Sequence, residues 1–167
     1  MNNDPDERAW HPQIVATDNG GVCLIYEKGL RFDPSTKTWS GDSAMYARVS
    51  TNSGETWGPA RRISSINAPN GRATHAKSFV CGRRIHLVWG DVPEGATLPK
   101  HAGYYVTSPD GGVTWSEPER VCAQWDDAAP CAVVGTDTRA VVLLAHGAIY
   151  ATVRTKLPEP PAAKPAA

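Results

Sequence analysis

The sequence predicts an all-β protein built from repeated units of four short strands, and three observations support this. A short signature occurs twice, beginning at Ser50 and again at Ser108. Several segments are apolar at almost every position, which is typical of strands that are buried on both faces. No segment of useful length shows a helical period. Architecture therefore has to be settled before any residue receives a chemical role.

The repeated signature predicts two hairpins. Residues 108–115 fit the pattern Ser-x-Asp-x-Gly-x-Thr-Trp at every specified position, and residues 50–57 depart from it only at Asn52. An Asp or Asn side chain can bond to the backbone that follows it, glycine supplies turn conformations, and Thr-Trp begins the next strand. Asn52 lacks the charge of an aspartate, so we expect the first hairpin to be held less firmly. The residues with this structural role are Ser50, Asn52, Gly54, Thr56, Trp57, Ser108, Asp110, Gly112, Thr114 and Trp115.

The repeat extends on both sides of the signature and gives the strands in order. The first unit contributes residues 11–16, 23–26, 46–49 and 57–63, and the second contributes 75–80, 86–89, 104–107 and 115–121. A third unit begins with residues 129–134 and continues through 141–145 and 149–153, without a copy of the signature. The second strand of each unit is almost continuously apolar, which predicts burial on both of its faces.

The signature resembles the Asp box, also called the BNR repeat, of the sialidase-like β-propellers, and the resemblance covers most of the chain. In that family the box joins the third and fourth strands of a four-stranded blade, at the outer rim and away from the substrate pocket. The resemblance implies a partial β-propeller of about three four-stranded antiparallel blades with Asp-box hairpins. Trp57 and Trp115 would pack inward as anchors of these hairpins.

The units divide the chain into five segments. These are a flexible N-terminal segment (1–8), blade 1 (9–64), blade 2 (65–122), an incomplete blade 3 (123–155) and a Pro/Ala-rich tail (156–167). Three blades are roughly half of a six-bladed ring. An open arc would expose the apolar faces of its first and last blades. We therefore expect either self-association or a chain that is part of a longer propeller, and an autonomous monomer is the least favoured alternative.

Charge and hydropathy exclude several classes of function. Seventeen Lys and Arg residues balance seventeen Asp and Glu residues, which argues against a general nucleic-acid surface. The N-terminal segment has neither a basic region nor an apolar core, so we expect no signal peptide, and no apolar run is long enough to span a bilayer. The sequence assigns no compartment and predicts no cofactor.

The four cysteines do not predict a metal site. The spacing of Cys23, Cys81, Cys122 and Cys131 matches no metal-binding signature. Cys23 and Cys131 fall in the cores of expected strands, which predicts buried free thiols. The alternative that Cys122 and Cys131 form a disulfide stays open, because these residues bracket the entry to the third unit.

Ligand binding in this architecture is expected where the first strand of each blade begins beside the propeller axis. Histidines stand at matching positions in the first two units, and two carboxylates join them in the third. The candidate ligand-binding residues are Trp10, His11, His75, Trp125, Asp126 and Asp127. If the ring forms, these side chains approach one funnel and can bind polar ligands or exchange protons. The alternative is that the repeated histidines are packing residues of the repeat.

The resemblance also bears on catalysis. Sialidases resemble one another in an arginine triad that binds the substrate carboxylate, in a Tyr/Glu nucleophile pair and in an Asp acid/base. Trp10 stands where the first arginine would fall, Arg8 is out of register, and a tryptophan cannot replace a guanidinium fork. The nucleophile pair has no place in these three units. We therefore expect a non-catalytic module that binds a glycan or polar ligand or acts as a scaffold. The alternative is a sialidase-like exo-glycoside hydrolase whose active site is completed by another chain or by further sequence.

Overall fold

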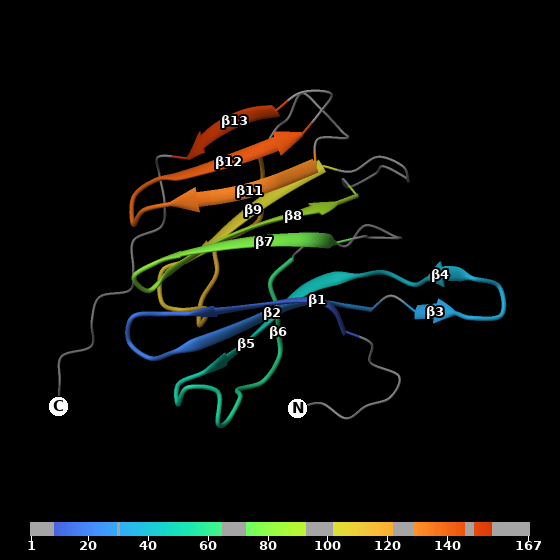
Figure 1. The fold of residues 1–167 in the computed structure, drawn as a ribbon, viewed down its shortest axis with the longest axis horizontal. Helices are drawn as coiled ribbons and strands as arrows, with labels where there is room; N and C mark the ends of the chain where they lie inside the picture. The colour runs from blue at the N-terminus through green and yellow to red at the C-terminus, as the bar shows by residue number, and fades with distance from the viewer. Residues whose placement is uncertain are drawn as a thin grey trace.

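The structure is a computed structural model that describes residues 9–29, 31–64, 73–92, 102–121, 129–145 and 149–154. Regular secondary structure in these ranges is entirely β, which confirms the predicted fold class. Three antiparallel sheets stack face to face, and we call them the first, second and third blades in chain order (Figure 1). No helix in the described ranges is long and apolar enough to span a membrane.

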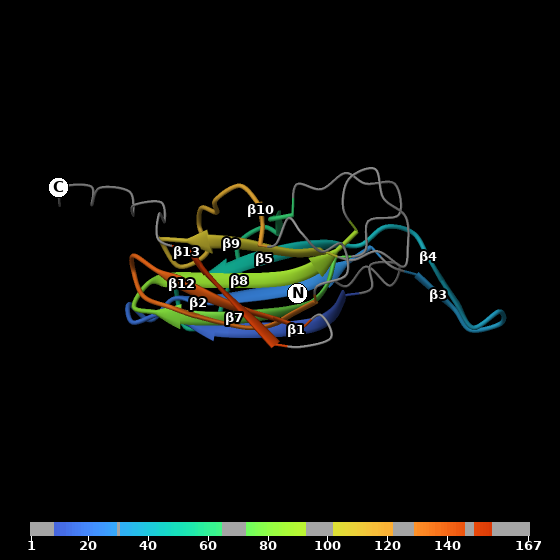
Figure 2. The same ribbon diagram turned by 90° about the horizontal axis from the view of Figure 1, so that it is seen from above.

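The first blade has four strands in the order β1-β2-β5-β6. Its strands are β1 (Ala9–Ala16), β2 (Val22–Lys28), β5 (Ala44–Ser50) and β6 (Arg61–Arg62). Between β2 and β5 the chain forms a separate hairpin of β3 (Arg31–Asp33) and β4 (Thr38–Ser40). This hairpin projects from one end of the stack as an arm (Figure 2) and was not predicted from the sequence.

The second blade repeats the four-strand plan of the first, and the third blade has three described strands. The second blade has the order β10-β9-β8-β7 and the third has the order β11-β12-β13. Their strands are β7 (Thr74–Cys81), β8 (Arg84–Asp91), β9 (Ala102–Ser108), β10 (Glu119–Arg120), β11 (Ala129–Gly135), β12 (Ala140–Ala145) and β13 (Ile149–Arg154).

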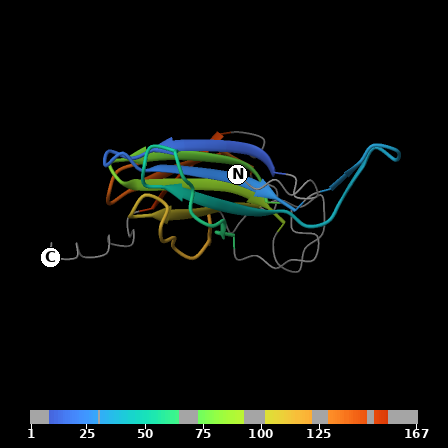
Figure 3. The same cartoon turned by 90° about the horizontal axis from the view of Figure 1, so that it is seen from below.

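The first strands of the three blades gather at one edge of the stack. β7 contacts β1 on one side and β11 on the other. The views from above and below show β1 and β7 along the same edge, with β9 toward the opposite edge (Figures 2 and 3). This is the arrangement of propeller blades, in which the first strand of each blade lies nearest the axis.

Burial differs between the middle blade and the outer two. Every residue of β8 and β9 is buried, whereas β2 and β12 alternate between buried and half-buried positions. One apolar core fills the space between the first and second blades, and another fills the space between the second and third. The expectation of two-sided burial for all three second strands is therefore wrong for β2 and β12, because only the middle blade has a neighbour on each face.

Residues 108–115 join β9 to β10, and one aspartate organises the turn. Asp110 Oδ1 accepts hydrogen bonds from Ser108 Oγ (2.9 Å) and from the Thr114 backbone N–H (2.8 Å), and Oδ2 accepts one from Thr114 Oγ1 (2.7 Å). Ser108 Oγ in turn accepts the backbone N–H of Gly112 at 2.7 Å. We call this segment the second signature hairpin.

Residues 50–57 join β5 to β6 as the first signature hairpin, and Asn52 takes the place of the aspartate. Asn52 Oδ1 accepts hydrogen bonds from Ser50 Oγ (2.9 Å) and the Thr56 backbone N–H (2.9 Å). Its amide Nδ2 donates to Thr56 Oγ1 at 2.9 Å, so one bond is reversed in direction and none is lost. The hydrogen bonds thus give no sign of the looser turn that the missing charge suggested.

The two hairpin tryptophans differ in their surroundings. Trp115 packs against the core between the first and second blades, and its Nε1 donates to the Gly112 carbonyl at 3.0 Å. Trp57 is half-buried and is not part of either described core cluster. The second hairpin therefore lies against another blade, whereas no described blade lies against the first.

The cysteines follow the sequence interpretation only in part. Cys23 is fully buried and free, and burial raises the pKa of its thiol to about 12. Cys131 lies at an irregular position of β11 and is exposed, which corrects the expectation that it belongs to a strand core. Cys122 lies outside the described residues, so its pairing with Cys131 stays a prediction.

Candidate functional site

The first strands of the blades share an irregularity near their beginnings. The register shifts after Trp10 in β1, after Thr74 in β7 and after Pro130 in β11. His11 and His75 lie within these bulges with φ values of 44° and 54°, in a region that non-glycine residues rarely adopt. Bulges of this kind redirect a side chain and cluster near functional sites. The repeat therefore holds two histidines in a strained backbone at equivalent positions.

A buried glutamate links the two histidines. Glu27, at the end of β2, has a side chain that is only 2% exposed. Its Oε1 lies 3.0 Å from His11 Nδ1 and accepts the backbone N–H of His75 at 2.7 Å. The two imidazole rings are tilted by 32° with centroids 5.0 Å apart. These three residues, which we call the His11–Glu27–His75 cluster, connect the first and second blades beside the axis.

The geometry of the cluster assigns a role to each ring nitrogen of His11. Because a carboxylate only accepts hydrogen bonds, the proton on His11 lies at Nδ1. In the neutral ring, Nε2 is then an acceptor, and after protonation both nitrogens donate. The His11 side chain is 54% exposed, so solvent reaches the imidazole ring. The Nδ1 atom of His75 lies 3.1 Å from Thr74 Oγ1, which orients the second ring.

The structure brings together some of the sequence-predicted site residues. His11 and His75 are in contact, and Trp10 lies beside them, directly opposite Glu27 in the β1–β2 register. Trp125, Asp126 and Asp127 lie outside the described residues. The described part of the chain contains no group of three or more His, Cys, Asp or Glu residues placed to hold a metal ion.

Glu27 is the site residue that sequence reasoning missed. The sequence feature that could have identified Glu27 is a charged residue near the end of an apolar strand. The second and third units carry Gly90 and Ala145 at this position. A carboxylate at the end of a strand is ordinarily solvated, so nothing local distinguishes this one. Its partners come from other strands, and only the stacking of two blades encloses it.

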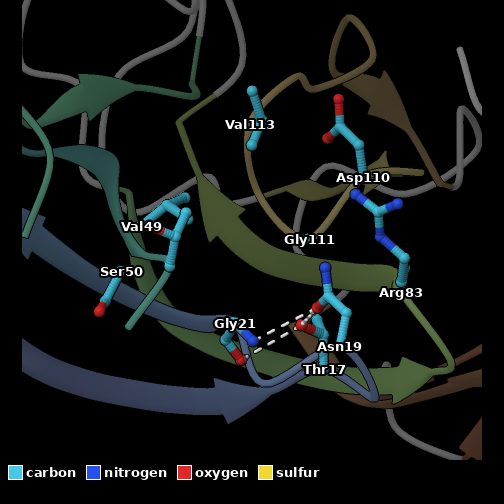
Figure 4. Close-up of a pocket in the computed structure, with 10 residues that line it drawn as sticks. Thr17, Asn19, Gly21, Val49, Ser50, Arg83, Asp110, Gly111 and Val113 are labelled. Atoms are coloured by element: carbon cyan, nitrogen blue, oxygen red, sulfur yellow. Dashed lines mark hydrogen bonds between the residues drawn. The ribbon is translucent and has the colours of Figure 1, made fainter. Parts of the chain in front are cut away.

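A small pocket lies at the other end of the stack and is not a comparable site. It holds about 90 Å³ between the turn after β1 and the second signature hairpin, with Thr17, Asn19, Arg83 and Asp110 among its lining residues (Figure 4). Thr17 Oγ1 donates to Asn19 Oδ1 at 2.6 Å inside it, so part of its polar lining is already paired. Ligand pockets usually measure about 300–1,000 Å³, so this hollow is too small for a sugar unit.

No protein-family model and no curated protein matches the sequence. Among solved structures, the chain is similar to an α-L-arabinanase of Penicillium chrysogenum complexed with arabinobiose, with a TM-score of 0.58 and 15% identity over 87% of this chain and 42% of that one. It is also similar to a Hadza microbial sialidase (TM-score 0.57, 18% identity, 85% of this chain and 34% of that one). A mutant Trypanosoma rangeli sialidase that displays trans-sialidase activity gives a TM-score of 0.54 at 15% identity, over 89% of this chain and 28% of that one.

The chain spans less than half the length of each of these structures. Identities below 20% carry the fold rather than an activity. The stacked antiparallel blades and these similarities agree with each other, and they confirm the resemblance first seen in the repeated signature. The chain therefore has a sialidase-like β-propeller fold.

Proposed function

We propose that this chain is a non-catalytic propeller module that binds a glycan or another polar ligand at the His11–Glu27–His75 cluster. The observation that carries the proposal is the buried Glu27 carboxylate, which holds two equivalent histidines in one place. A buried carboxylate is costly unless it is hydrogen-bonded, and here its bonds order groups that border solvent. Sugar hydroxyls both donate and accept, and an imidazole pair offers both functions.

The exposure of His11 favours binding over simple packing. A residue that only fills space in a repeat is expected to be buried, yet more than half of the His11 side chain is in contact with solvent. The strained backbone at His11 and His75 supports the same conclusion, because a left-handed conformation at a histidine costs on the order of 1–3 kcal/mol. Trp10, the half-buried residue before His11, is the aromatic side chain at this strand end on which a sugar ring would stack.

The same cluster supports a non-catalytic role. Most glycosidases use two carboxyl groups that flank the scissile bond, and Glu27 is the one carboxylate that the described residues bring to the cluster. Trp10 stands at the place where sialidases have an arginine, and it cannot form the two parallel hydrogen bonds that a guanidinium group gives to a carboxylate. Binding thus requires fewer additional residues than catalysis does.

A second candidate is a sialidase-like exo-glycoside hydrolase whose active site is completed by another chain or by further sequence. One observation favours it: the similar solved structures include sialidases and an arabinanase, and this chain spans less than half of each. In that case the cluster would form one side of a larger catalytic site.

A glycan array probed with the purified chain, followed by calorimetric titration of any hit, tests the proposal. We expect a hit whose binding is lost in the His11→Ala, His75→Ala double variant and retained in Lys77→Ala, a control at an exposed position of β7. An array without hits, or a hit unaffected by the double variant, would contradict the proposal. Turnover of a fluorogenic sialoside or arabinofuranoside by the assembled material, in which another copy or further sequence completes the site, would instead support the hydrolase.

A further inference from the structure

We infer that two copies of this chain associate head to tail, with the outer face of the third blade of one copy packed on the outer face of the first blade of the other. The inference concerns the blade faces and does not depend on the proposed ligand site. Its occupant is a second copy of the same chain. Three independent comparisons between covered and uncovered faces support it.

The first and second blades carry equivalent aromatic pairs, one on an uncovered face and one on a covered face. On the face of the second blade that covers the first blade, Trp89 and Tyr104 lie opposite each other in the β8–β9 register, with ring centroids 6.0 Å apart. Both are buried, Trp89 completely, in the core that the two blades share. This stacked pair is therefore part of an inter-blade interface.

The first blade carries the same pair on its outer face. Tyr26 and Tyr46 lie opposite each other in the β2–β5 register, with ring centroids 6.1 Å apart and planes at 22°. They alternate along the strands with Ile25 and Glu27, which face the second blade, so they point to the other side. On this outer face Ile14 is 67% exposed. The first blade thus presents an aromatic pair of the kind that packs on a preceding blade.

The outer face of the third blade matches the face of the first blade on which the second blade packs. Val134, Val141 and Val153 are cross-strand partners on its outer face, and Val134 and Val153 are 51% and 54% exposed. Their counterparts in the first blade are Val15, Cys23 and Val49, a row on which the second blade packs. The described residues of this outer face are all apolar: Ala132, Val134, Val141, Leu143, Ala145, Ile149, Ala151 and Val153. An apolar surface of this kind marks an interaction site.

Gly54 and Gly112 are equivalent glycines of the two signature hairpins, and their surroundings differ. A Cβ at Gly112 would lie 2.6 Å from Cys23 Sγ and 3.1 Å from Val49 Cγ2, so this hairpin sits directly on the preceding blade. At Gly54, the one atom of the described residues that a Cβ would meet within 4 Å belongs to Trp57 of the same hairpin. The first hairpin has the same turn, but no described blade lies beneath it. Val141 and Val153 of a second copy occupy the positions that would complete this contact.

Charge selects the pairing between unlike faces. The outer face of the first blade carries Lys28, whose Nζ lies 5.4 Å from the Tyr46 ring centroid, and Arg48, which donates to the Gly58 carbonyl at 2.7 Å. Pairing two first blades would oppose these cations, whereas the described outer face of the third blade has no charge. Two copies joined head to tail form the same interface twice and close a ring of about six blades, within the four to eight that propellers use.

Two substitutions test the interface, each on a different face. Val153→Arg and Ile14→Arg alter residues that are more than half exposed, so the fold should be retained, and circular dichroism with thermal unfolding checks this. By light scattering over a dilution series, we expect the wild-type chain to be a dimer at micromolar concentration. Each variant should associate roughly 100-fold more weakly, because a charge is buried without a partner. Val113→Glu, at an exposed position away from both faces, is the control, and Ile149→Arg is a second variant on the third blade.

Mixing the two variants separates this interface from a symmetric one. A mixed pair keeps one intact interface, between the third blade of the Ile14→Arg copy and the first blade of the Val153→Arg copy. At a concentration where neither variant associates alone, we expect the equimolar mixture to associate. The inference would be overturned if the wild-type chain stays monomeric at about 100 μM. It would also be overturned if either variant remains a dimer, or if the mixture of the two variants stays monomeric.

Discussion

His86 Nδ1 lies 2.9 Å from the Tyr105 hydroxyl in the interior between the second and third blades. The other ring nitrogen, Nε2, lies 3.1 Å from the Thr136 carbonyl oxygen, so it carries the proton and Nδ1 accepts from Tyr105. Burial lowers the pKa of His86 to about 4 and raises the pKa of Tyr105 to about 12. A neutral hydrogen-bonded chain thus joins the two blades.

This pair predicts a loss of stability in mild acid. The unfolded chain protonates His86 near its ordinary pKa of 6.5, while the folded chain does so only near pH 4. The unfolded state therefore binds more protons between these values, and the free energy of unfolding falls as pH decreases from 6.5 to 4, by at most on the order of 3 kcal/mol. Urea unfolding across this range, compared with His86→Gln, measures the effect. If the free energy of unfolding changes equally with pH in the wild-type protein and in His86→Gln, the assignment of this effect to His86 is wrong.

Removal of the Glu27 carboxylate should weaken the junction between the first two blades. Glu27→Ala leaves the His75 backbone N–H without its acceptor, and we expect a loss of about 1 kcal/mol of stability. Glu27→Gln keeps an oxygen acceptor and should retain most of the stability. Nitrogen chemical shifts report the His11 tautomer, and the preference for a proton on Nδ1 should disappear in Glu27→Ala. An unchanged tautomer would show that the glutamate does not orient this ring.

The two hairpin tryptophans should contribute unequally to stability. Trp115 packs against the inter-blade core, so Trp115→Ala should cost about 3 kcal/mol. Trp57→Ala should cost about 1 kcal/mol, the usual effect of a point substitution, because Trp57 is half-buried outside both cores. Chemical denaturation of the two variants measures the difference. Losses of equal size would mean that the second hairpin gains nothing from its contact with the first blade.

An asparagine should serve the second hairpin nearly as well as its aspartate. Asn52 already forms the full set of turn hydrogen bonds in the first hairpin. Asp110→Asn should therefore change the free energy of unfolding by less than about 1 kcal/mol. Asp110→Ala removes the acceptors for Ser108 and Thr114, and should cost about 2 kcal/mol. A large loss in Asp110→Asn would indicate that charge, rather than the hydrogen bonds, holds the turn.

The sequence predicted what local patterns encode. The all-β class, the strand order within each blade and the matching places of His11 and His75 follow from repeated segments and turn chemistry. The β3–β4 arm was missed because its residues are not among the segments that align between the units. Glu27 was missed because its donors come from β1 and β7, and only blade stacking brings them together.

One-sided burial could not be predicted for a related reason. The apolar pattern of β2 and β12 is that of a strand with a neighbour on each side, and a pattern does not report whether the neighbour belongs to the same copy. The fold of each blade is encoded locally, whereas the covering of the outer blades depends on what packs against them.

The close approach of Gly112 to Cys23 also bears on the order in which the blades assemble. Each blade is made of strands that follow one another in the chain, so a blade can form as soon as its residues have left the ribosome. The surface on which the second hairpin rests belongs to the blade that was synthesised earlier. During translation the second hairpin therefore emerges after the residues on which it packs, and we expect its docking to follow the synthesis of both blades.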